Sequence, residues 1–409
     1  MLKTGPKSVF ILIVIFTFCT CIDPYFPNLK SYESLLVVDG LITDANSSYT
    51  VKLSRTIQDQ NVPPAMVQDA LVFISDDAGN KIYLTNRGKG IYKTDSTEFR
   101  GIIGKTYILH IKTGGVNEYE SDPCLMQSVP EIDSLYFEKD QELINNGTEN
   151  IEGIRIYLDS KPGGRNQFYR WDFTETWKFK VPNPKKYDFF GTGNIVPVAK
   201  VNSYCWKNRK SDEVLITGNS TGGSDHIEKE PMLFVGTNKS DRIMLEYSVL
   251  VRQYSISGNE YDFWHNLKQV NLSGGDIFAS QPYSVISNIH NKNNINERVL
   301  GYFQVSAVKE ERIFIPFSEV VRLHLPFFHY NQCDRIEKSP GDFPWPANSP
   351  PLNWNDVYEM YVKSSDYVFI EPLYNSQTGV LEKLVFAKPE CADCTLTGTI
   401  AKPDFWIDL

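Results

Sequence analysis

The sequence predicts a mostly β protein, with an Ig-like β-sandwich over residues 34–130 and a larger antiparallel β domain over residues 131–409 that carries a short helix. Aromatic residues are abundant (24 Phe, 22 Tyr and 7 Trp against 6 Met), and aromatic side chains favour strands. Short alternating segments recur at roughly ten-residue spacing through the first domain. The 409-residue length allows two or three domains at about 100–200 residues each. The net charge of -9 argues against sequence-independent nucleic-acid binding, which needs a basic surface.

Residues 1–20 have the pattern of an export signal. Lys3 and Lys7 form a short positive region, and an almost unbroken apolar run from Val9 to Phe18 follows it. This run is shorter than the ~20 residues that a membrane-spanning helix needs, so a signal peptide is favoured over an anchor helix.

Cys21 follows the apolar run and the small residue Thr20, which resembles a bacterial lipobox. In a lipobox the cysteine thiol receives a diacylglycerol and becomes the first residue of the mature protein. We therefore predict lipidation at Cys21, a lipid-anchored tether over residues 21–33, and membrane attachment through acyl chains. The alternative is a soluble secreted protein in which Cys21 is an ordinary residue.

The first domain is expected to contain six or seven short strands. The segment 49–54 alternates with period two, and a turn at 76–80 links two strands as a hairpin. The predicted strands cover residues 35–43, 49–54, 70–74, 82–84, 90–92 and 104–111. This pattern is typical of an Ig-like sandwich and carries no information about activity.

The second domain contains longer strands. On one of them, an aromatic row is expected on one face and polar residues on the other: Tyr169, Trp171, Phe173, Trp177 and Phe179 against Arg170, Asp172, Thr174 and Lys178. An aromatic row can stack sugars, but the inner face of a sheet is the favoured interpretation because aromatic side chains gain most from burial. A second alternating strand covers residues 243–252. Ser257-Gly258-Asn259-Glu260 fits a capping box and predicts a short helix behind it, followed by strands at 301–307 and 312–315.

Five cysteines follow Cys21 along the chain: Cys124, Cys205, Cys333, Cys391 and Cys394. The spacing of Cys391 and Cys394 occurs in redox and zinc motifs. Their neighbours predict a loop and then a strand, whereas a redox pair opens a helix. A zinc site would need two further ligands, and the candidates Cys333 and His329 match no common spacing. Structural disulfide bonds are favoured, with Cys391 and Cys394 each pairing to a distant cysteine such as Cys333 or Cys205, which leaves Cys124 free.

Two segments rich in aromatic residues, 183–194 and 339–354, lack the pattern of a strand or helix and are predicted to be loops. The prolines of the second loop argue against helix and central strand. Aromatic side chains held by prolines lose little entropy on binding, so the second loop suits a contact surface; the alternative is that this loop folds back and covers the sheet edge or core. The candidate contact residues are Phe189, Phe190, Phe343, Trp345 and Trp354.

Several segments together resemble one family. They are Cys21-Ile22-Asp23-Pro24-Tyr25, residues 35–40, residues 247–254 with Tyr261 and Trp264, residues 301–303 and 312–314, and the closing stretch from Cys391 to Trp406. In combination they resemble the domain-of-unknown-function 4249 lipoproteins of Bacteroidetes. The resemblance implies an outer-membrane lipoprotein, often encoded beside a TonB-dependent receptor, without an established catalytic role. His290 stands where a family cysteine is expected, which leaves the disulfide partners open.

The leading functional hypothesis is a non-enzymatic outer-membrane lipoprotein that captures a ligand for a TonB-dependent receptor in nutrient uptake. It would be anchored by lipid on the cell surface, with the periplasmic face as the alternative. We expect no catalytic residues, metal or cofactor; neither a His-Glu-x-x-His motif nor a phosphate-binding glycine loop occurs in the sequence. The rival hypotheses are an exported hydrolase acting on glycans or peptides, whose paired carboxylates would meet only in the fold, and a purely structural or adhesive envelope protein.

Overall fold

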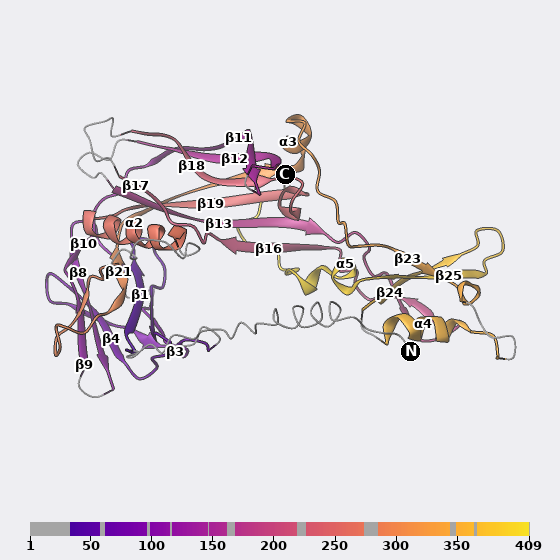
Figure 1. Cartoon of the computed structure of the whole chain (residues 1–409), viewed down its shortest axis with the longest axis horizontal. Helices are drawn as coiled ribbons and strands as arrows, with labels where there is room; N and C mark the ends of the chain where they lie inside the picture. The colour runs from indigo at the N-terminus through magenta and orange to yellow at the C-terminus, as the bar shows by residue number, and fades with distance from the viewer. Residues whose placement is uncertain are drawn as a thin grey trace, which may run out of the picture.

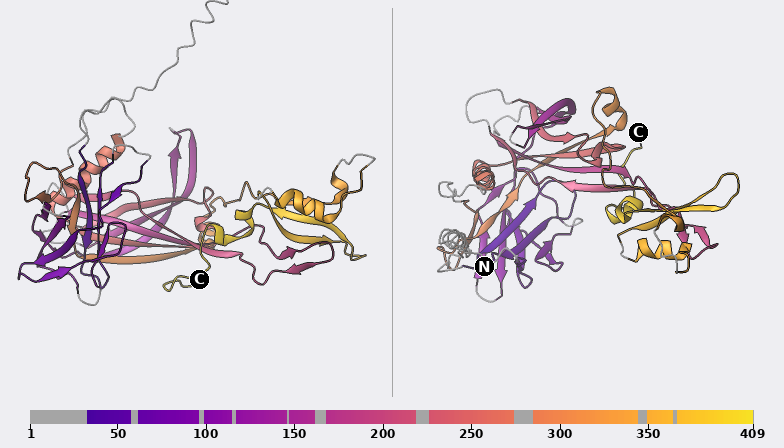
Figure 2. Two further views of the ribbon diagram at one scale, coloured as in Figure 1. Left: turned by 90° about the horizontal axis from the view of Figure 1, so that it is seen from below. Right: turned by 45° about the vertical axis from the view of Figure 1, so that its right-hand side comes forward.

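The computed structural model describes residues 33–57, 62–95, 99–114, 117–145, 147–161, 168–218, 226–273, 285–343, 349–363 and 366–408. The predicted signal and Cys21 lie outside the described residues, as does nearly all of the tether. Strands dominate the described chain, so the prediction of a mostly β fold is confirmed. Three β-rich parts follow one another along an elongated molecule, which we call the first sandwich, the second sandwich and the distal module (Figures 1 and 2).

The first sandwich consists of two six-stranded sheets that enclose one hydrophobic core. One sheet contains β1 (Leu36–Ile42), β2 (Thr50–Arg55), β3 (Ala65–Met66), β6 (Thr85–Asn86), β7 (Ile91–Lys93) and β21 (Leu300–Val305). The other contains β4 (Leu71–Asp76), β5 (Lys81–Tyr83), β8 (Thr106–Thr113), β9 (Asn117–Ser121), β10 (Cys124–Leu125) and β20 (Ile289–Asn291). Alternate side chains of β1 point into the core, as the period of two requires.

The first sandwich takes two strands from far along the chain, so its sheets are not built from residues 34–130 alone. Strand β21 pairs in parallel with β1, and β20 pairs antiparallel with β9. Phe303 of β21 is fully buried in the same core as the N-terminal strands. Asn288 fixes the two added strands to each other, because its side chain both donates to and accepts from the backbone of Phe303, at 2.9 and 3.0 Å. Hydrophobic periodicity cannot reveal such a pairing, since each strand has the same local pattern whichever sheet it joins.

The second sandwich is built from longer strands. One sheet contains β11 (Ile132–Ile144), β12 (Glu149–Ser160) and β18 (Ile227–Gly236). The other, which we call the long sheet, contains β13 (Phe168–Lys180), β16 (Tyr204–Lys210), β17 (Leu215–Gly218), β19 (Glu246–Ser255) and β22 (Val308–Pro316). The aromatic row from Tyr169 to Phe179 lies in the core between these sheets, with each ring at most 8% exposed. The row is therefore structural.

One longer helix and two short helical elements accompany the second sandwich in the described residues. Helix α2 (Gly258–Ser273) begins where the capping signal predicts, with Ser257 Oγ accepting the backbone N–H of Glu260 at 3.2 Å, and it runs longer than the short helix that was expected. The other elements are η1 (Asp241–Ile243) and α3 (Phe317–Arg322). No helix among the described residues is both long and apolar enough to cross a bilayer.

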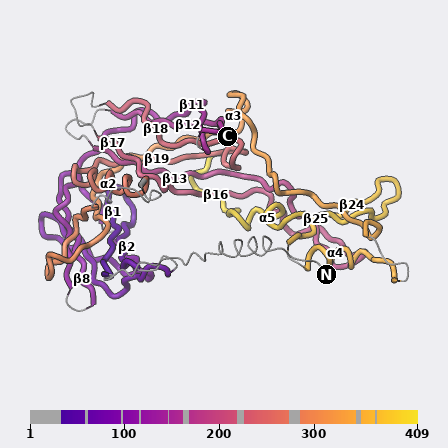
Figure 3. Tube along the Cα trace, viewed as in Figure 1, coloured from indigo at the N-terminus to yellow at the C-terminus, as the bar shows by residue number. Residues whose placement is uncertain are grey.

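The distal module brings together segments that are far apart in the sequence (Figure 3). It contains the hairpin β14 (Tyr187–Phe189) and β15 (Ile195–Pro197), the sheet β23 (Ile336–Lys338), β24 (Val368–Tyr374) and β25 (Leu381–Ala387), and the helices η2 (Pro340–Asp342) and α4 (Trp354–Val362). The expectation that prolines exclude helix from 339–354 is corrected at both ends of that loop. Pro340 occupies the first turn of η2, where a missing N–H costs nothing, and Asn353 caps α4 immediately after the prolines.

Two disulfide bonds hold the closing segment of the chain, one to the long sheet and one to the segment that precedes β23. Cys205 of β16 is bonded to Cys394, and Cys333 is bonded to Cys391, with Cα–Cα distances of 5.6 and 5.5 Å. Cys124 carries a free thiol. The segment around the closing cysteines is not loop followed by strand: it forms α5 (Pro389–Ala392) and η3 (Cys394–Leu396). Pro389 favours the first helical turn, and the Asp393 side chain caps η3 by accepting the N–H of Thr395 at 2.9 Å.

Candidate functional site

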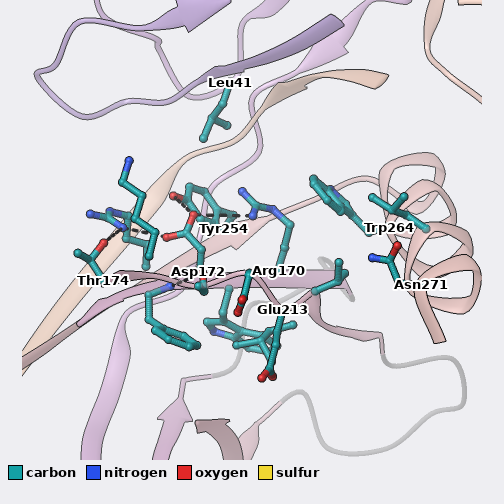
Figure 4. A pocket seen from close by; sticks show the side chains of 17 residues that line it. Leu41, Arg170, Asp172, Thr174, Glu213, Tyr254, Trp264 and Asn271 are labelled. Carbon is teal, nitrogen blue, oxygen red and sulfur yellow. Dashed lines mark hydrogen bonds and ion pairs between the residues drawn. The ribbon is translucent and has the colours of Figure 1, made fainter. Parts of the chain in front are cut away.

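A cleft lies between the outer face of the first sandwich and the long sheet. It consists of two adjoining cavities of about 510 and 630 Å³ that share Leu41, Arg252 and Tyr254. The long sheet forms one wall, β1 forms the facing wall, and helix α2 closes one end with Trp264 and Asn271 (Figure 4). Both volumes fall in the range of small-molecule sites, roughly 300–1,000 Å³. We refer to the two cavities as the inter-domain cleft.

The polar face of the long sheet supplies the charged groups of the cleft. In the register of the sheet, Asp172 of β13 lies opposite Arg252 of β19, which lies opposite Glu310 of β22. Arg252 therefore donates to Asp172 Oδ1 through Nη1 at 2.9 Å and to Glu310 Oε1 through Nε at 2.9 Å. A third hydrogen bond joins Arg252 to Thr174 Oγ1 at 3.2 Å. Every one of these side chains stands on the face opposite the aromatic row, because successive residues of a strand alternate between faces.

Arg170 lies deeper in the cleft, where two aromatic rings hold it. The register places Arg170 opposite Tyr254, and its guanidinium carbon lies 4.4 Å from the Tyr254 ring centroid and 5.1 Å from that of Trp264. Figure 4 shows the guanidinium pointing between these two rings. The Tyr254 hydroxyl donates to Asp172 Oδ2 at 3.0 Å, so its ring is fixed as well. Contacts of this kind are worth about 0.5–2 kcal/mol each.

Burial and neighbouring charges set the protonation of the cleft. Burial raises the pKa of Tyr254, and the Asp172 carboxylate raises it further, so the phenol stays a hydrogen-bond donor. Burial opposes the charge of Arg252, but Asp172, Tyr254 and Glu310 together outweigh it and leave the pKa of Arg252 raised. Behind the cleft, burial raises the pKa of Glu260 to about 7, although the Arg170 charge and a hydrogen bond from Trp264 act in the opposite direction.

The facing wall belongs to the first sandwich. Asp39 and Leu41 point outward from β1, since their neighbours Val38, Gly40 and Ile42 face the core. Lys52 of β2 lines the same wall. The cleft thus combines apolar surface, the donor groups of two arginines and the acceptor oxygens of several carboxylates, which is a set of groups suited to binding a polar small molecule. Among the described residues, no group of three or more His, Cys, Asp or Glu side chains could hold a metal ion.

The residues predicted to contact a partner differ in how far they are buried. Phe189 is buried in the distal module, and Phe343 and Trp354 pack against the same core, so these side chains cover the sheet as the alternative interpretation expects. Phe190 is 67% exposed and remains available for contact. Trp345 and the lipidation residue Cys21 lie outside the described residues. The four cysteines predicted to pair form the two disulfide bonds described above.

The cleft residues were seen in the sequence only as the polar side of two strands. Arg170, Asp172 and Thr174 were placed opposite the aromatic row, and Arg252 opposite a second apolar row. A usable signal was present, because charged residues recur at every second position in the middle of strands whose other face is wholly buried. The strand register and the approach of the first sandwich were not readable from the sequence, so the side chains could not be assembled into one site.

The fold is that of a β protein with a ligand-sized site between two sandwiches. Its two disulfide bonds indicate an exported protein, because disulfide bonds persist outside the cytoplasm. The chain belongs to the family described as domain of unknown function (DUF4249), whose family model matches residues 22–312. The matched region spans the first sandwich and both walls of the cleft. No curated protein matches the chain.

Proposed function

We propose that this protein is a non-enzymatic, lipid-anchored outer-membrane protein of Bacteroidetes that captures a nutrient in the inter-domain cleft for a TonB-dependent receptor. The inter-domain cleft carries this proposal, because it offers a ligand-sized space walled by hydrogen-bonding groups held in a rigid network. Membership of the DUF4249 family, the two disulfide bonds and the lipobox-like Cys21 support the location.

The geometry also favours a particular arrangement at the membrane. Residue 33 leads directly into β1, so the tether from Cys21 meets the first sandwich. Its 13 residues (21 to 33 inclusive) span at most about 45 Å at ~3.3–3.6 Å per residue. The distal module, with the exposed Phe190, lies at the far end of the molecule and is free to contact a receptor (Figure 2).

A hydrolase in this cleft would need a carboxylate free to act on substrate. Asp172 accepts hydrogen bonds from Arg252 and Tyr254, and Glu310 accepts one from Arg252. Asp212 pairs with Arg209, and the two remaining lining carboxylates, Asp39 and Glu213, belong to different cavities of the cleft. Residues 218–222 match Gly-x-Ser-x-Gly, but all except Gly218 lie outside the described residues, and the next described element is strand β18 rather than the helix that follows a nucleophile elbow. Binding is therefore the function that the site supports best.

The test is to purify the tagged protein from membranes of its host and to identify what accompanies it. We expect an acylated Cys21 and one outer-membrane transporter as a stoichiometric companion. The Cys21→Ala variant is the control, and it should leave the membrane fraction and lose the companion. Recovery of the wild-type protein alone, or with an unmodified thiol at Cys21, would show the proposal to be wrong.

A further inference from the structure

The deep end of the inter-domain cleft contains an arginine whose hydrogen-bonding capacity is unused. Arg170 is only 9% exposed, and its Nε has no hydrogen-bond partner among the described residues. The carboxylate that pairs with it, Asp172, lies 3.7 Å from Nη1, whereas Arg252 makes two contacts of 2.9 Å. Buried guanidinium groups are normally fully hydrogen-bonded, because an unmet donor loses its water without compensation.

Neighbouring acidic groups do not meet this need. Both oxygens of Asp172 already accept closer hydrogen bonds, from Arg252 and from Tyr254. Glu260 acts on Arg170 only at longer range, since no ion pair joins the two among the described side chains. On the floor of the cleft, Asp172 and Glu310 therefore make their short contacts with Arg252, and Arg170 keeps only its 3.7 Å ion-pair contact with Asp172.

The two aromatic rings orient Arg170 without occupying its hydrogen-bonding edge. The Arg170 guanidinium carbon lies over the Tyr254 and Trp264 rings, 4.4 and 5.1 Å from their centroids, and among the described residues no hydrogen bond joins Arg170 to either side chain. Arg170 lines the cavity of about 510 Å³, and Figure 4 shows its guanidinium between Tyr254 and Trp264. Around it, Leu41 and Leu267 add apolar surface.

We infer that the inter-domain cleft binds a small organic carboxylate, whose carboxylate group sits on Arg170 and whose apolar body lies against Trp264, Leu41 and Leu267. A carboxylate matches the fork of a guanidinium with two parallel hydrogen bonds, and a ring-stacked arginine is already oriented for them. This inference rests on the proposed function of the cleft as a ligand-capture site and assigns its ligand class.

Matched pairs of small probes test the inference. Phenylacetate and indole-3-acetate are titrated into the purified protein by calorimetry, beside phenylacetamide and indole-3-acetamide, which have nearly the same shape but no charge. We expect each carboxylate to bind roughly tenfold or more tightly than its carboxamide. Equal binding within a pair, no binding by either carboxylate, or tighter binding by inorganic phosphate would overturn the inference.

The Arg170→Lys variant tests the role of the fork itself. It keeps the positive charge but loses the bidentate geometry, so carboxylate affinity should fall roughly tenfold while the carboxamides are unaffected. Arg312→Lys is the matched control, because Arg312 is also a ring-stacked arginine of the long sheet (3.6 Å from the Phe405 centroid) but does not line the cleft. Unchanged carboxylate affinity in a folded Arg170→Lys protein would contradict the assignment.

The outcome is separable from that of the proposed function. Loss of carboxylate binding with the transporter still co-purifying would overturn the ligand class alone. Carboxylate binding by a protein that never co-purifies with a transporter would overturn the proposed partner alone.

Discussion

Tyr247 donates its hydroxyl hydrogen to Glu175 Oε1 across 2.7 Å, and both side chains are buried in the core of the second sandwich. Glu175 stands in the middle of the aromatic row, between Phe173 and Trp177 on the same face of β13. Arg242 of η1 balances the charge, with Nη1 2.8 Å from Glu175 Oε1. Arg209 of β16 lies 3.9 Å from Glu175 Oε2, so the apolar interior of the long sheet contains a charged group whose partners come from three other elements.

This arrangement predicts that Arg242→Met destabilises the protein. Without Arg242, the Glu175 carboxylate would keep Tyr247 and the more distant Arg209 but lose its closest charge partner, and breaking a buried pair on one side costs up to about 3–5 kcal/mol. Urea unfolding would measure the change in the free energy of unfolding, and Glu175→Gln added to Arg242→Met should recover part of it. Lys363→Met is the control, since Lys363 pairs with Glu359 on an exposed helix face and should cost less than about 1 kcal/mol. A loss of similar size in both single variants would contradict the prediction.

Closure of the first sandwich by β21 predicts that Gly301→Ala is strongly destabilising. Gly301 has φ of +86°, and a Cβ there would collide with the carbonyl oxygen of Val38 in the neighbouring strand. Backbone strain alone costs about 1–2 kcal/mol, and the collision would separate the parallel pair as well, so we expect a loss above ~2 kcal/mol. Gly379→Ala is the matched control, because Gly379 also has a positive φ (+69°) but has open space around its Cα. Equal shifts in the thermal midpoints of the two variants would argue against a structural role for β21.

The sequence is informative about the fold wherever the local pattern decides it. The alternation in β13 and the capping residue Ser257 were sufficient to place a buried strand face and a helix start. Pairings over long distances were not predictable, since the parallel partner of Val38 is Gly301 and no local pattern connects them. Helical turns close to prolines and cysteines were also missed, because capping by Asn353 and Asp393 decides them within a few residues.

The candidate site was harder to predict for the same reason. Arg170 and Asp172 were visible as polar residues of a strand, but their role depends on Arg252 and Tyr254, which face them only through the register of β13 and β19. Trp264 was visible as part of a helix stripe, yet it contacts Arg170 because α2 turns back over the end of the sheet. The chemistry of the cleft therefore arises from tertiary structure that carries no short sequence motif.

The disulfide bond between Cys333 and Cys391 predicts which part of the protein unfolds first when the bond is removed. The bond closes a loop with a sequence separation of 58 residues, and it holds the connection into β23 against α5. Replacing both cysteines by serine should cost about 2–4 kcal/mol, mostly in the distal module. Limited proteolysis followed by mass spectrometry should therefore find cleavage within residues 336–387 before any cleavage within residues 65–93 of the first sandwich. Cleavage that begins in the first sandwich, or an unchanged cleavage rate, would contradict this.

The buried carboxyl group of Glu260 predicts a measurable pH dependence of stability. Burial raises its pKa from 4.5 to about 7 in the folded protein, so between these values the folded state holds a proton that an unfolded glutamate releases. The stabilisation from this group is complete below pH 4.5 and is lost as the pH rises through 7, by on the order of 3 kcal/mol. Glu260→Gln keeps an oxygen that can accept the Trp264 indole N–H but cannot ionise.

The comparison of the two proteins isolates this one group. In urea unfolding series at several pH values, the wild-type free energy of unfolding should fall relative to the variant between pH 4.5 and 7 and run parallel to it at higher pH. Every other titrating group is common to both proteins and cancels in the difference. Curves that stay parallel across the whole range would show that Glu260 ionises in the folded protein as it does in the unfolded chain, which would contradict the prediction.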